Sequence, residues 1–534
     1  MSKQILFDDE ARRQLQSGVR KLGRAVRVTY GPSGRNVMIE KGLGKMTVTR
    51  DGLNVSREIE VEQPFHNMGA KLLNEVANRT NKEVGDGNTS AVILAEAMIE
   101  EGLKFVGTGV NPIALRTGME RAVENAIAGL AEHTVEVENR KMIEQVGTIA
   151  SNEPELGKLF GEAMNKVGLQ GVVTVEENDG VETHLDLVEG FEIDKGYLSP
   201  YFITDAQNLE VVLDDTLILV TDQKISSLGD ILPVLEQAAS SGKPLLIVAE
   251  DVEGEALSAL IVNRLRGVLR VAAIKAPGFG DRRKAMLEDF SVMTGGTFFA
   301  KDTGFSWNDV QLTDLGRAKK VEISKDKTLV FKGAGKKANI DARCEQLESQ
   351  IAQTTSNYDK EKLEERLAKI SGQIAVIRVG GMSEAEIKER KDRADDALSA
   401  TRAAMEEGVV PGAGTAYIRA IPYVEETKAR GDEKFGVEVI ARALRAPLTQ
   451  LANNLGEDGP AIVAEVEEAE EWSHGFDGKT RKVTDLMRVG VIDALKVMRV
   501  ALQNAASIAT LTLTSDTAIT EVAKEVDPVE GALS

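Results

Sequence analysis

The middle of the chain alternates between apolar runs of strand length and helical patterns. Apolar runs at 216–220, 244–249 and 271–274 are separated by helical patterns at about 228–239 and 253–266. This succession of strand, helix, strand, helix and strand predicts a parallel sheet joined by right-handed crossovers. No glycine fingerprint follows the first strand, so the pattern does not predict a dinucleotide site. It predicts an α/β module that has some other use.

The two helices of this module carry more apolar residues than packing against one sheet face requires. Leu228, Ile231, Leu232 and Leu235 already make one full stripe in the first helix, and Leu257, Leu260, Ile261, Val262 and Leu265 cover more than one face of the second. Residues 196–202, which include a glycine and a proline, add three aromatic residues in a loop-like stretch nearby. A surplus of this kind indicates an exposed surface that binds apolar partners. The alternative is packing in the core of the module, which is the favoured interpretation for any single residue.

Most of the remaining chain has helical periodicity. Helices are expected around 15–26, 66–82, 91–99, 111–133, 340–351, 363–370 and 383–407. A hairpin of short strands is expected at 37–39 and 46–49, across the glycines of 42–44, and a strand-like stretch at 185–193 is expected to break at Gly190. Asp493 precedes a late apolar helix and, considered alone, is an N-cap residue.

Residues 83–90, Glu-Val-Gly-Asp-Gly-Asn-Thr-Ser, join two of these helices. Gly85 and Gly87 allow a ligand to approach the backbone, and the free N–H groups at a helix start favour an anion. Asp86 would repel a phosphate unless a cation lies between them, which indicates a metal–nucleotide complex with Asp86 on Mg²⁺. The alternative is a plain turn with a glycine C-cap and a threonine N-cap. Both interpretations stay open on this stretch alone.

The composition excludes several classes of protein. The 534 residues suffice for three or four domains, and the net charge of −20 argues against nucleic acid and anionic membranes as partners. A single cysteine, Cys344, excludes an internal disulfide framework and favours a reducing compartment, hence a cytoplasmic location. Four scattered histidines form no zinc cluster, the N-terminus does not resemble a signal peptide, and no apolar run has membrane-spanning length.

Several glycine-rich motifs are recognisable when they are taken together. They are Thr29-Tyr30-Gly31-Pro32, Arg50-Asp51-Gly52, residues 85–90, Gly412-Ala413-Gly414, Asp493 and the run 275–284, Lys-Ala-Pro-Gly-Phe-Gly-Asp-Arg-Arg-Lys. Over residues 3–522 the chain closely resembles the group I chaperonins, the GroEL family of 60 kDa chaperonins. The match is more specific than any single motif.

The resemblance implies a multidomain α+β and α/β fold with three nested domains. A mostly helical equatorial ATPase and ring-contact domain would comprise 1–133 and 408–534. A small intermediate hinge domain would comprise 134–189 and 375–407. The apical α/β domain, with parallel strands and flanking helices, would comprise 190–374 and bind polypeptides and a co-chaperonin.

The resemblance also implies an ATP-driven folding machine. Its cofactors would be ATP, Mg²⁺ and K⁺. Its partners would be non-native polypeptides, a small GroES-like lid and copies of itself in two stacked seven-membered rings, with neither nucleic acid nor a membrane among them.

Site residues follow from the matching motif positions. Asp396 resembles the carboxylate that positions the attacking water, with Asp51 assisting, and Asp86 resembles the Mg²⁺ ligand. The nucleotide contacts would be Thr29, Tyr30, Gly31, Pro32, Arg50, Asp86, Gly87, Asn88, Thr89, Ser90, Ala413, Gly414, Asp477, Gly478, Lys479 and Asp493. The residues that match the family's polypeptide-binding and lid-binding surface are Tyr197, Tyr201, Phe202, Leu232, Leu235, Leu257, Ile261 and Val262. Lys195 and Glu384 match an ion pair between neighbouring subunits.

The sequence departs from the family pattern at a few positions. Asn88 replaces a hydroxyl residue, and Pro411 and Ala413 interrupt a run that is usually Ala-Gly-Gly-Gly. Gln373 replaces a hinge glycine, Ala494 replaces a proline, and a Gly-Gly-Met tail is absent. The missing tail leaves a second hypothesis, a specialised paralogue or one with weak ATPase that only holds or scaffolds proteins. The retained carboxylates Asp51, Asp86 and Asp396 favour the folding machine.

Overall fold

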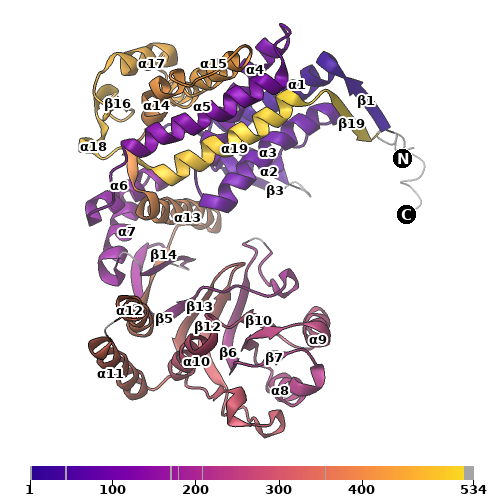
Figure 1. Cartoon of the computed structure of the whole chain (residues 1–534), viewed down its shortest axis with the longest axis vertical. Coiled ribbons are helices and arrows are strands. Elements are labelled where there is room, and N and C mark those ends of the chain that lie inside the picture. The colour runs from indigo at the N-terminus through magenta and orange to yellow at the C-terminus, as the bar shows by residue number, and fades with distance from the viewer. Residues whose placement is uncertain are drawn as a thin grey trace. The chain divides into compact units, whose positions relative to one another are not determined.

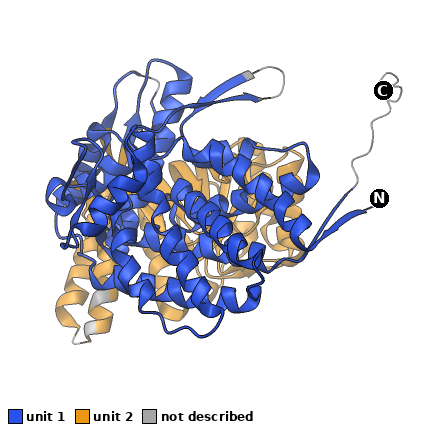
Figure 2. Cartoon of the chain, turned by 90° about the horizontal axis from the view of Figure 1, so that it is seen from above, with its two compact units in different colours: residues 1–165, 175–184, 377–534 blue, residues 166–174, 185–376 orange. Residues whose placement is uncertain are grey.

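The computed structural model describes residues 3–41, 45–168, 171–178, 180–206, 208–354 and 356–521. The chain forms two compact units (Figure 2). Unit 1 comprises 1–165, 175–184 and 377–534, and unit 2 comprises 166–174 and 185–376. Each unit has its own hydrophobic core, so each is described by itself. The finer division into three domains stays a prediction.

Unit 1 consists mostly of helices (Figure 1). They are α1 (Asp8–Arg27), α2 (Gly52–Glu58), α3 (Pro64–Val84), α4 (Asn88–Val106), α5 (Pro112–Glu132), α6 (Arg140–Ser151), α7 (Pro154–Val167, which ends in unit 2), α13 (Glu384–Glu407), α14 (Thr415–Glu425), α15 (Glu433–Ala443), α16 (Ala446–Asn454), α17 (Gly459–Glu468), α18 (Leu486–Val489) and α19 (Leu495–Thr514). The helices expected at 15–26, 66–82, 91–99, 111–133 and 383–407 are confirmed as α1, α3, α4, α5 and α13, and the apolar helix expected after Asp493 is confirmed as α19.

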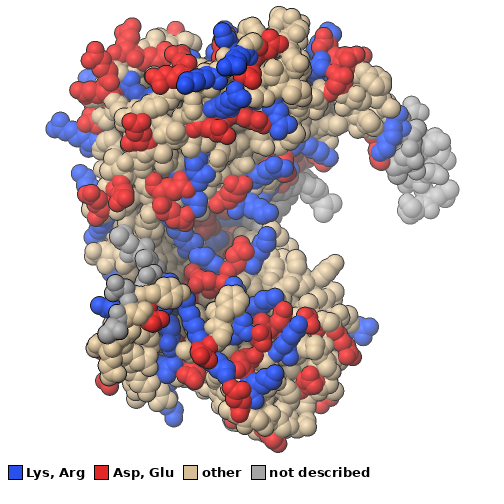
Figure 3. Space-filling model, viewed as in Figure 1, with Lys and Arg blue, Asp and Glu red and all other residues tan. Residues whose placement is uncertain are grey.

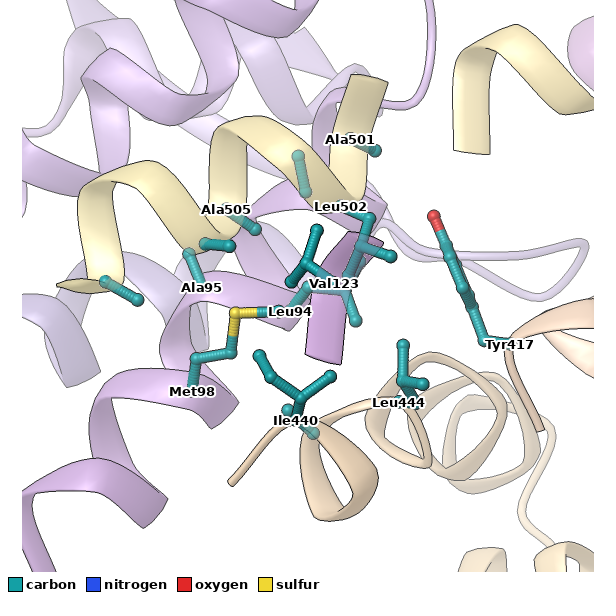
Figure 4. Packing of buried hydrophobic residues seen from close by; sticks show 14 of the residues in the cluster. Leu94, Ala95, Met98, Val123, Tyr417, Ile440, Leu444, Ala501, Leu502 and Ala505 are labelled. Atoms are coloured by element: carbon teal, nitrogen blue, oxygen red, sulfur yellow. The ribbon is translucent and has the colours of Figure 1, made fainter. Parts of the chain in front are cut away.

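The core of unit 1 forms around α4, which is buried on most sides. Its residues Leu94 and Met98 are fully buried and pack near Leu502 of α19 and Ile440 of α15 (Figure 4). Each buried side chain of this size stabilises the fold by about 1.5–3 kcal/mol relative to an exposed one. Packing of α4 in the core therefore holds the start of this helix in a defined position within unit 1.

The described residues of unit 1 also form four two-stranded sheets. They pair β1 (Lys3–Phe7) with β19 (Thr517–Glu521), β2 (Val37–Lys41) with β3 (Lys45–Thr49), β15 (Val409–Pro411) with β18 (Ile492–Ala494), and β16 (His474–Asp477) with β17 (Lys482–Asp485). The expected hairpin is confirmed as β2 and β3, although its turn at 42–44 lies outside the described residues. Residues 522–534, where the sequence analysis notes no Gly-Gly-Met tail, also lie outside them.

Asp493 is not an N-cap residue. It lies inside β18 opposite Val410 of β15, and Ala494 occupies the N-cap of α19. The interpretation from the sequence is wrong because Asp493 pairs with Val410, a residue distant in the sequence. This pairing holds Asp493 one position before the N-cap of α19.

Unit 2 contains most of a nine-stranded sheet in the order β10-β8-β6-β12-β13-β5-β14-β4, with β11 beside β6. The strands are β4 (Val172–Glu177), β5 (His184–Ile193), β6 (Val211–Thr221), β8 (Leu245–Ala249), β10 (Val271–Lys275), β11 (Phe298–Phe299), β12 (Gly316–Ile323), β13 (Thr328–Gly333) and β14 (Gln373–Val379). The chain passes between the units within α7, β4, β5 and β14. A short parallel pair, β7 (Lys224–Ile225) with β9 (Asp251–Val252), lies apart from this sheet.

The predicted parallel strands are confirmed, because β6, β8 and β10 pair in parallel. Their crossovers are α8 (Leu228–Ser241) and α9 (Gly254–Leu265). The sheet as a whole is mixed, since β12 pairs antiparallel with both β6 and β13, and β13 pairs antiparallel with β5. The other helices of unit 2 are α10 (Gly280–Thr294), α11 (Lys337–Gln353) and α12 (Asn357–Ser371), and the last two form the expected helical pair.

The expected break at Gly190 is wrong, because β5 runs through this residue. A Cβ atom at Gly190 would lie 2.6 Å from both the Val330 carbonyl oxygen and Ile374 Cδ1. Glycine is therefore required by the close approach of neighbouring strands rather than by a turn.

The surface carries charges of both signs, which intermingle on the face shown in Figure 3. Within the described ranges, no helix combines the length and the apolar character that crossing a bilayer requires. Cys344 is a free thiol that packs, partly buried, against the core of unit 2.

Candidate functional site

A cavity of about 770 Å³ lies within unit 1, a volume typical of small-molecule sites. Every residue that the sequence analysis assigned to catalysis or to nucleotide binding lines it. The residues come from turns far apart in the chain, at 29–32, 50–51, 86–90, 413–414 and 477–479, together with Asp396 and Asp493. The structure therefore brings the predicted site residues together, whatever their individual roles.

The turn between α3 and α4 forms one wall of the cavity. Gly85 caps α3 with φ of 70°, and Gly87 is the N-cap of α4 with φ of 78° and no side-chain cap. The expected glycine C-cap is thus present, whereas a threonine N-cap is not, because the helix already begins at Asn88. The N–H groups in the first turn of α4 have no partner within the helix, and with the helix dipole they form an anion-binding end.

The turn at Asp51 packs directly on this wall. A Cβ atom at Gly52 would lie 2.1 Å from Thr89 Oγ1, so the two turns are in close contact. Asp51 caps α2, because Oδ1 accepts a hydrogen bond from Leu53 N at 2.9 Å and Oδ2 accepts one from Asn54 N at 3.0 Å. Capping fixes the Asp51 carboxylate at the cavity.

Four aspartates of the cavity are held in an environment that disfavours their charge. Burial raises the pKa of Asp396 well above its usual range, and the charges of Asp51 and Asp86 add to this shift. Burial also raises the pKa values of Asp86 and Asp51. It raises the pKa of Asp493 to about 7, with a further contribution from Asp86.

These carboxylates fit a bound cation. In the described part of the chain, none of Asp51, Asp86, Asp396 and Asp493 forms a salt bridge with a lysine or arginine. In that described part of the chain, no three carboxylate, imidazole or thiol side chains form a group that could hold a metal without further ligands. Mg²⁺ in nucleotide sites takes one or two carboxylates and completes its shell with phosphate oxygens and water. The donor set therefore suits Mg²⁺ that arrives with a nucleotide.

Hydrogen bonds shape the rest of the lining. Arg50 Nη2 donates to the carbonyls of Gly31 at 3.1 Å and Pro32 at 2.8 Å, and the hydroxyls of Ser90 and Tyr30 are 3.2 Å apart. Arg50 thus holds the turn at 29–32, a role that the sequence analysis did not assign to it.

Two further turns complete the lining. Asp477 Oδ1 accepts a hydrogen bond from Lys479 N at 2.9 Å, which closes the turn at 477–479. Ala413 has φ of 55°, a left-handed conformation that favours glycine, the residue common at this position in the resembled family.

Asp392 lines the same cavity, and the sequence analysis did not select it. It lies on α13 four residues before Asp396, so the helical spacing of the two aspartates was a signal available in the sequence. Its contact with Asn54 of α2 joins residues 338 positions apart, and no local pattern carries that information.

The model of the TCP-1/cpn60 chaperonin family matches residues 22–523. The chain belongs to this family. It is accordingly an ATP-dependent chaperone of the GroEL type, and such chaperonins form oligomeric rings that bind client proteins. Among solved structures, this chaperonin is similar to gp146 from the bacteriophage EL 2 (Pseudomonas aeruginosa), a chaperonin crystallised in the presence of ATP-BeFx. The TM-score is 0.68 at 20% identity, and the match covers 97% of this chain and 99% of that chain, which shows a shared fold.

Unit 2 of the chaperonin exposes only part of the predicted apolar surface. Tyr201, Leu232 and Val262 are exposed, by 63%, 41% and 42%. Phe202 and Leu235 are buried in the core, at 0% and 7%, so the expectation of exposure is wrong for these two. Leu235 points inward because it shares the buried stripe of α8. Tyr197, Leu257 and Ile261 are partly buried against the core.

Lys195 and Glu384 lie in different units, with Glu384 in the first turn of α13. Their pairing between neighbouring subunits stays a prediction.

Proposed function

We propose that this chaperonin hydrolyses ATP with Mg²⁺ in the cavity of unit 1 and couples the hydrolysis to capture and release of non-native polypeptides. The observation that carries the proposal is the group of partly buried aspartates, none of which forms a salt bridge among the described residues, beside the start of α4. A cation would neutralise the aspartates and a phosphate group would accept hydrogen bonds from the helix start, so the two together would stabilise the site. That gp146 was crystallised with ATP-BeFx supports a nucleotide in this fold.

Each wall of the cavity has a distinct part in the proposed reaction. Asp86 would hold Mg²⁺, and the first-turn N–H groups of α4 would bind phosphate oxygens. Bound Mg²⁺ neutralises phosphate charge. Asp396 would orient the attacking water and accept its proton, with Asp51 assisting, and its raised pKa makes its ionised form a stronger base. K⁺ is proposed as a second cation on the resemblance alone.

The proposed assembly is two stacked seven-membered rings closed by a GroES-like lid, located in the cytoplasm. Support for contacts between copies comes from the strand pairs β1–β19 and β2–β3. Each exposes an apolar cross-strand pair, Ile5 with Ile519 and Met38 with Val48. A two-stranded ribbon is marginally stable alone, so pairing with another copy would stabilise both. Tyr201, Leu232 and Val262 would contribute to client binding.

The proposal is tested by ATP turnover together with refolding of an aggregation-prone client, with and without a co-chaperonin. The wild type should hydrolyse ATP and return active client. Asp396→Ala should bind ATP and hydrolyse it at least about 10²-fold more slowly, because water positioning is lost while the phosphate site remains. Turnover of this variant within a few-fold of wild type would overturn the catalytic assignment. Client binding without any turnover in the wild type would favour the holding paralogue.

A further inference from the structure

Asp392 is a carboxylate of the cavity that the proposed mechanism does not use. It lies one helical turn before Asp396, so the two side chains share one side of α13 and both line the cavity. The intervening Asp395 is instead paired with Lys391, at 3.1 Å. Burial, together with the charge of Asp51, raises the pKa of Asp392 to about 6. A carboxylate in this place repels Asp51 unless another group offsets the repulsion.

The charges of Lys391 and Lys388 offset part of this repulsion, and Asn54 adds a direct bond to each of the two carboxylates. The backbone N–H of Asn54 donates to Asp51 Oδ2 at 3.0 Å, and its side-chain Nδ2 donates to Asp392 Oδ2 at 3.3 Å. One neutral residue of α2 is thus bonded to two carboxylates of like charge, one on α2's own cap and one on α13. Asparagine suits this position because its amide donates hydrogen bonds without adding a charge to the site.

We propose that Asn54 and Asp392 form a clasp that positions α13, and with it Asp396, against the Asp51 turn for ATP hydrolysis. This inference rests on the proposed function and concerns positioning residues. Asp51 and Asp396 come from separate elements, and their charges repel each other. The hydrogen bond from Asn54 of α2 to Asp392 of α13 would hold the Asp51 and Asp396 carboxylates in a fixed position relative to each other. Misplacement of a catalytic group by about 1 Å can slow a reaction by about 10²-fold, so a single bond at this place has a measurable effect.

The clasp is tested in the full chain with Asn54→Ala, Asp392→Ala and the double variant. Each single variant should lower kcat by about tenfold, the double variant should be no worse than either, and KM should change by less than about twofold. Affinity for a non-hydrolysable ATP analogue should likewise be unchanged. Asp392→Asn keeps an acceptor for Asn54 Nδ2 and should retain kcat within about threefold of wild type.

Asp395→Asn is the matched control. It removes a carboxylate that, like Asp392, acts on Asp396 through its charge, yet it leaves the clasp in place. Its kcat should stay above that of Asp392→Ala. If Asp395→Asn and Asp392→Asn both reproduce the loss, charge rather than the bond is responsible, and the clasp is wrong. Hydrogen exchange gives a readout without turnover: Asn54→Ala should increase exchange in α2 and around 392–396, and Asp395→Asn should not increase it in α2.

Failure of the clasp and failure of the proposed function give different results. If wild type does not hydrolyse ATP, or Asp396→Ala retains turnover, the proposed function fails. If Asp396→Ala is inactive while Asn54→Ala and Asp392→Ala match wild type, the clasp alone fails.

Discussion

Asn88 occupies the first position of α4, where chaperonins of this type commonly have a hydroxyl residue. The residue is 6% exposed, and its Nδ2 donates to Asn81 Oδ1 at 3.3 Å, so the side chain is held by α3. Binding of phosphate at a helix start depends chiefly on backbone N–H groups, which an asparagine leaves unchanged. The departure is therefore compatible with a working site.

Asn88→Thr should change ATP turnover by less than about threefold, because Thr89, Ser90 and the backbone donors remain. Asp86→Lys should abolish turnover, because it places an ammonium group where Mg²⁺ is expected. Both variants are measured by steady-state ATPase across a Mg²⁺ titration, with thermal unfolding as the control for folding. An inactive wild type that Asn88→Thr activates would contradict this view of the position.

Glu96 is a buried acid in α4 outside the cavity. Its side chain is 6% exposed, and Arg27 Nη1 lies 3.5 Å from its Oε2. Burial raises its pKa to about 7, since the arginines nearby offset only part of the desolvation. Because the folded-state pKa lies above that of the unfolded chain, this group contributes stability that is present below pH 4.5 and lost as pH rises through about 7.

Glu96→Gln should therefore raise the free energy of unfolding at pH 8 by about 1–3 kcal/mol and change it much less at pH 5. Denaturant unfolding at the two pH values measures the difference. An equal loss of stability at both pH values would mean instead that Glu96 is ionised in the fold and stabilised by Arg27.

Among the elements, those with an uninterrupted pattern could be predicted from the sequence. The helical spacing of apolar residues predicted α1 and α4, and continuous apolar runs predicted β6, β8 and β10. Strand β12 was missed because its first inward residues, Gly316 and Ala318, are small, and because the adjacent Lys319 and Lys320 interrupt the apolar alternation that marks a strand. The convergence of the turns on one cavity followed from the resemblance. Neither the contact of Asp392 with Asn54 nor the strand pairing of Asp493 could be predicted, since both depend on residues distant in the sequence.

The two crossover helices of unit 2 allow core packing to be distinguished from the proposed client binding. Leu235 of α8 is buried, so Leu235→Ser should destabilise unit 2 by about 2–4 kcal/mol through lost burial and a cavity. Val262 of α9 is 42% exposed, so Val262→Ser should cost less than about 1 kcal/mol and still weaken capture of an unfolded client. Thermal unfolding and a client-aggregation assay distinguish the two. Equal destabilisation by both variants would contradict the assignment of Val262 to the surface.

At the scale of the whole molecule, ring formation depends on surfaces that one copy leaves uncovered. Val37 and Ile39 of β2 pack against the core of unit 1, whereas Met38 between them points outward and is 72% exposed. Its partner across the hairpin, Val48, is 51% exposed. The alternation of side chains along a strand therefore gives the hairpin one face that packs on the core and one exposed apolar face, which we propose contacts a neighbouring copy.

Met38→Glu combined with Val48→Glu should leave the melting temperature of unit 1 within about 2 °C, because exposed substitutions change stability little, and should prevent ring assembly. Two carboxylates on this face would have to be desolvated without partners on contact with a neighbouring copy. Native mass spectrometry measures the assembly directly. Ile113→Glu is the control, since Ile113 is 63% exposed at the start of α5 and belongs to no strand pair. Intact rings in the double variant, or loss of rings in the control as well, would show that the hairpin is not the specific contact.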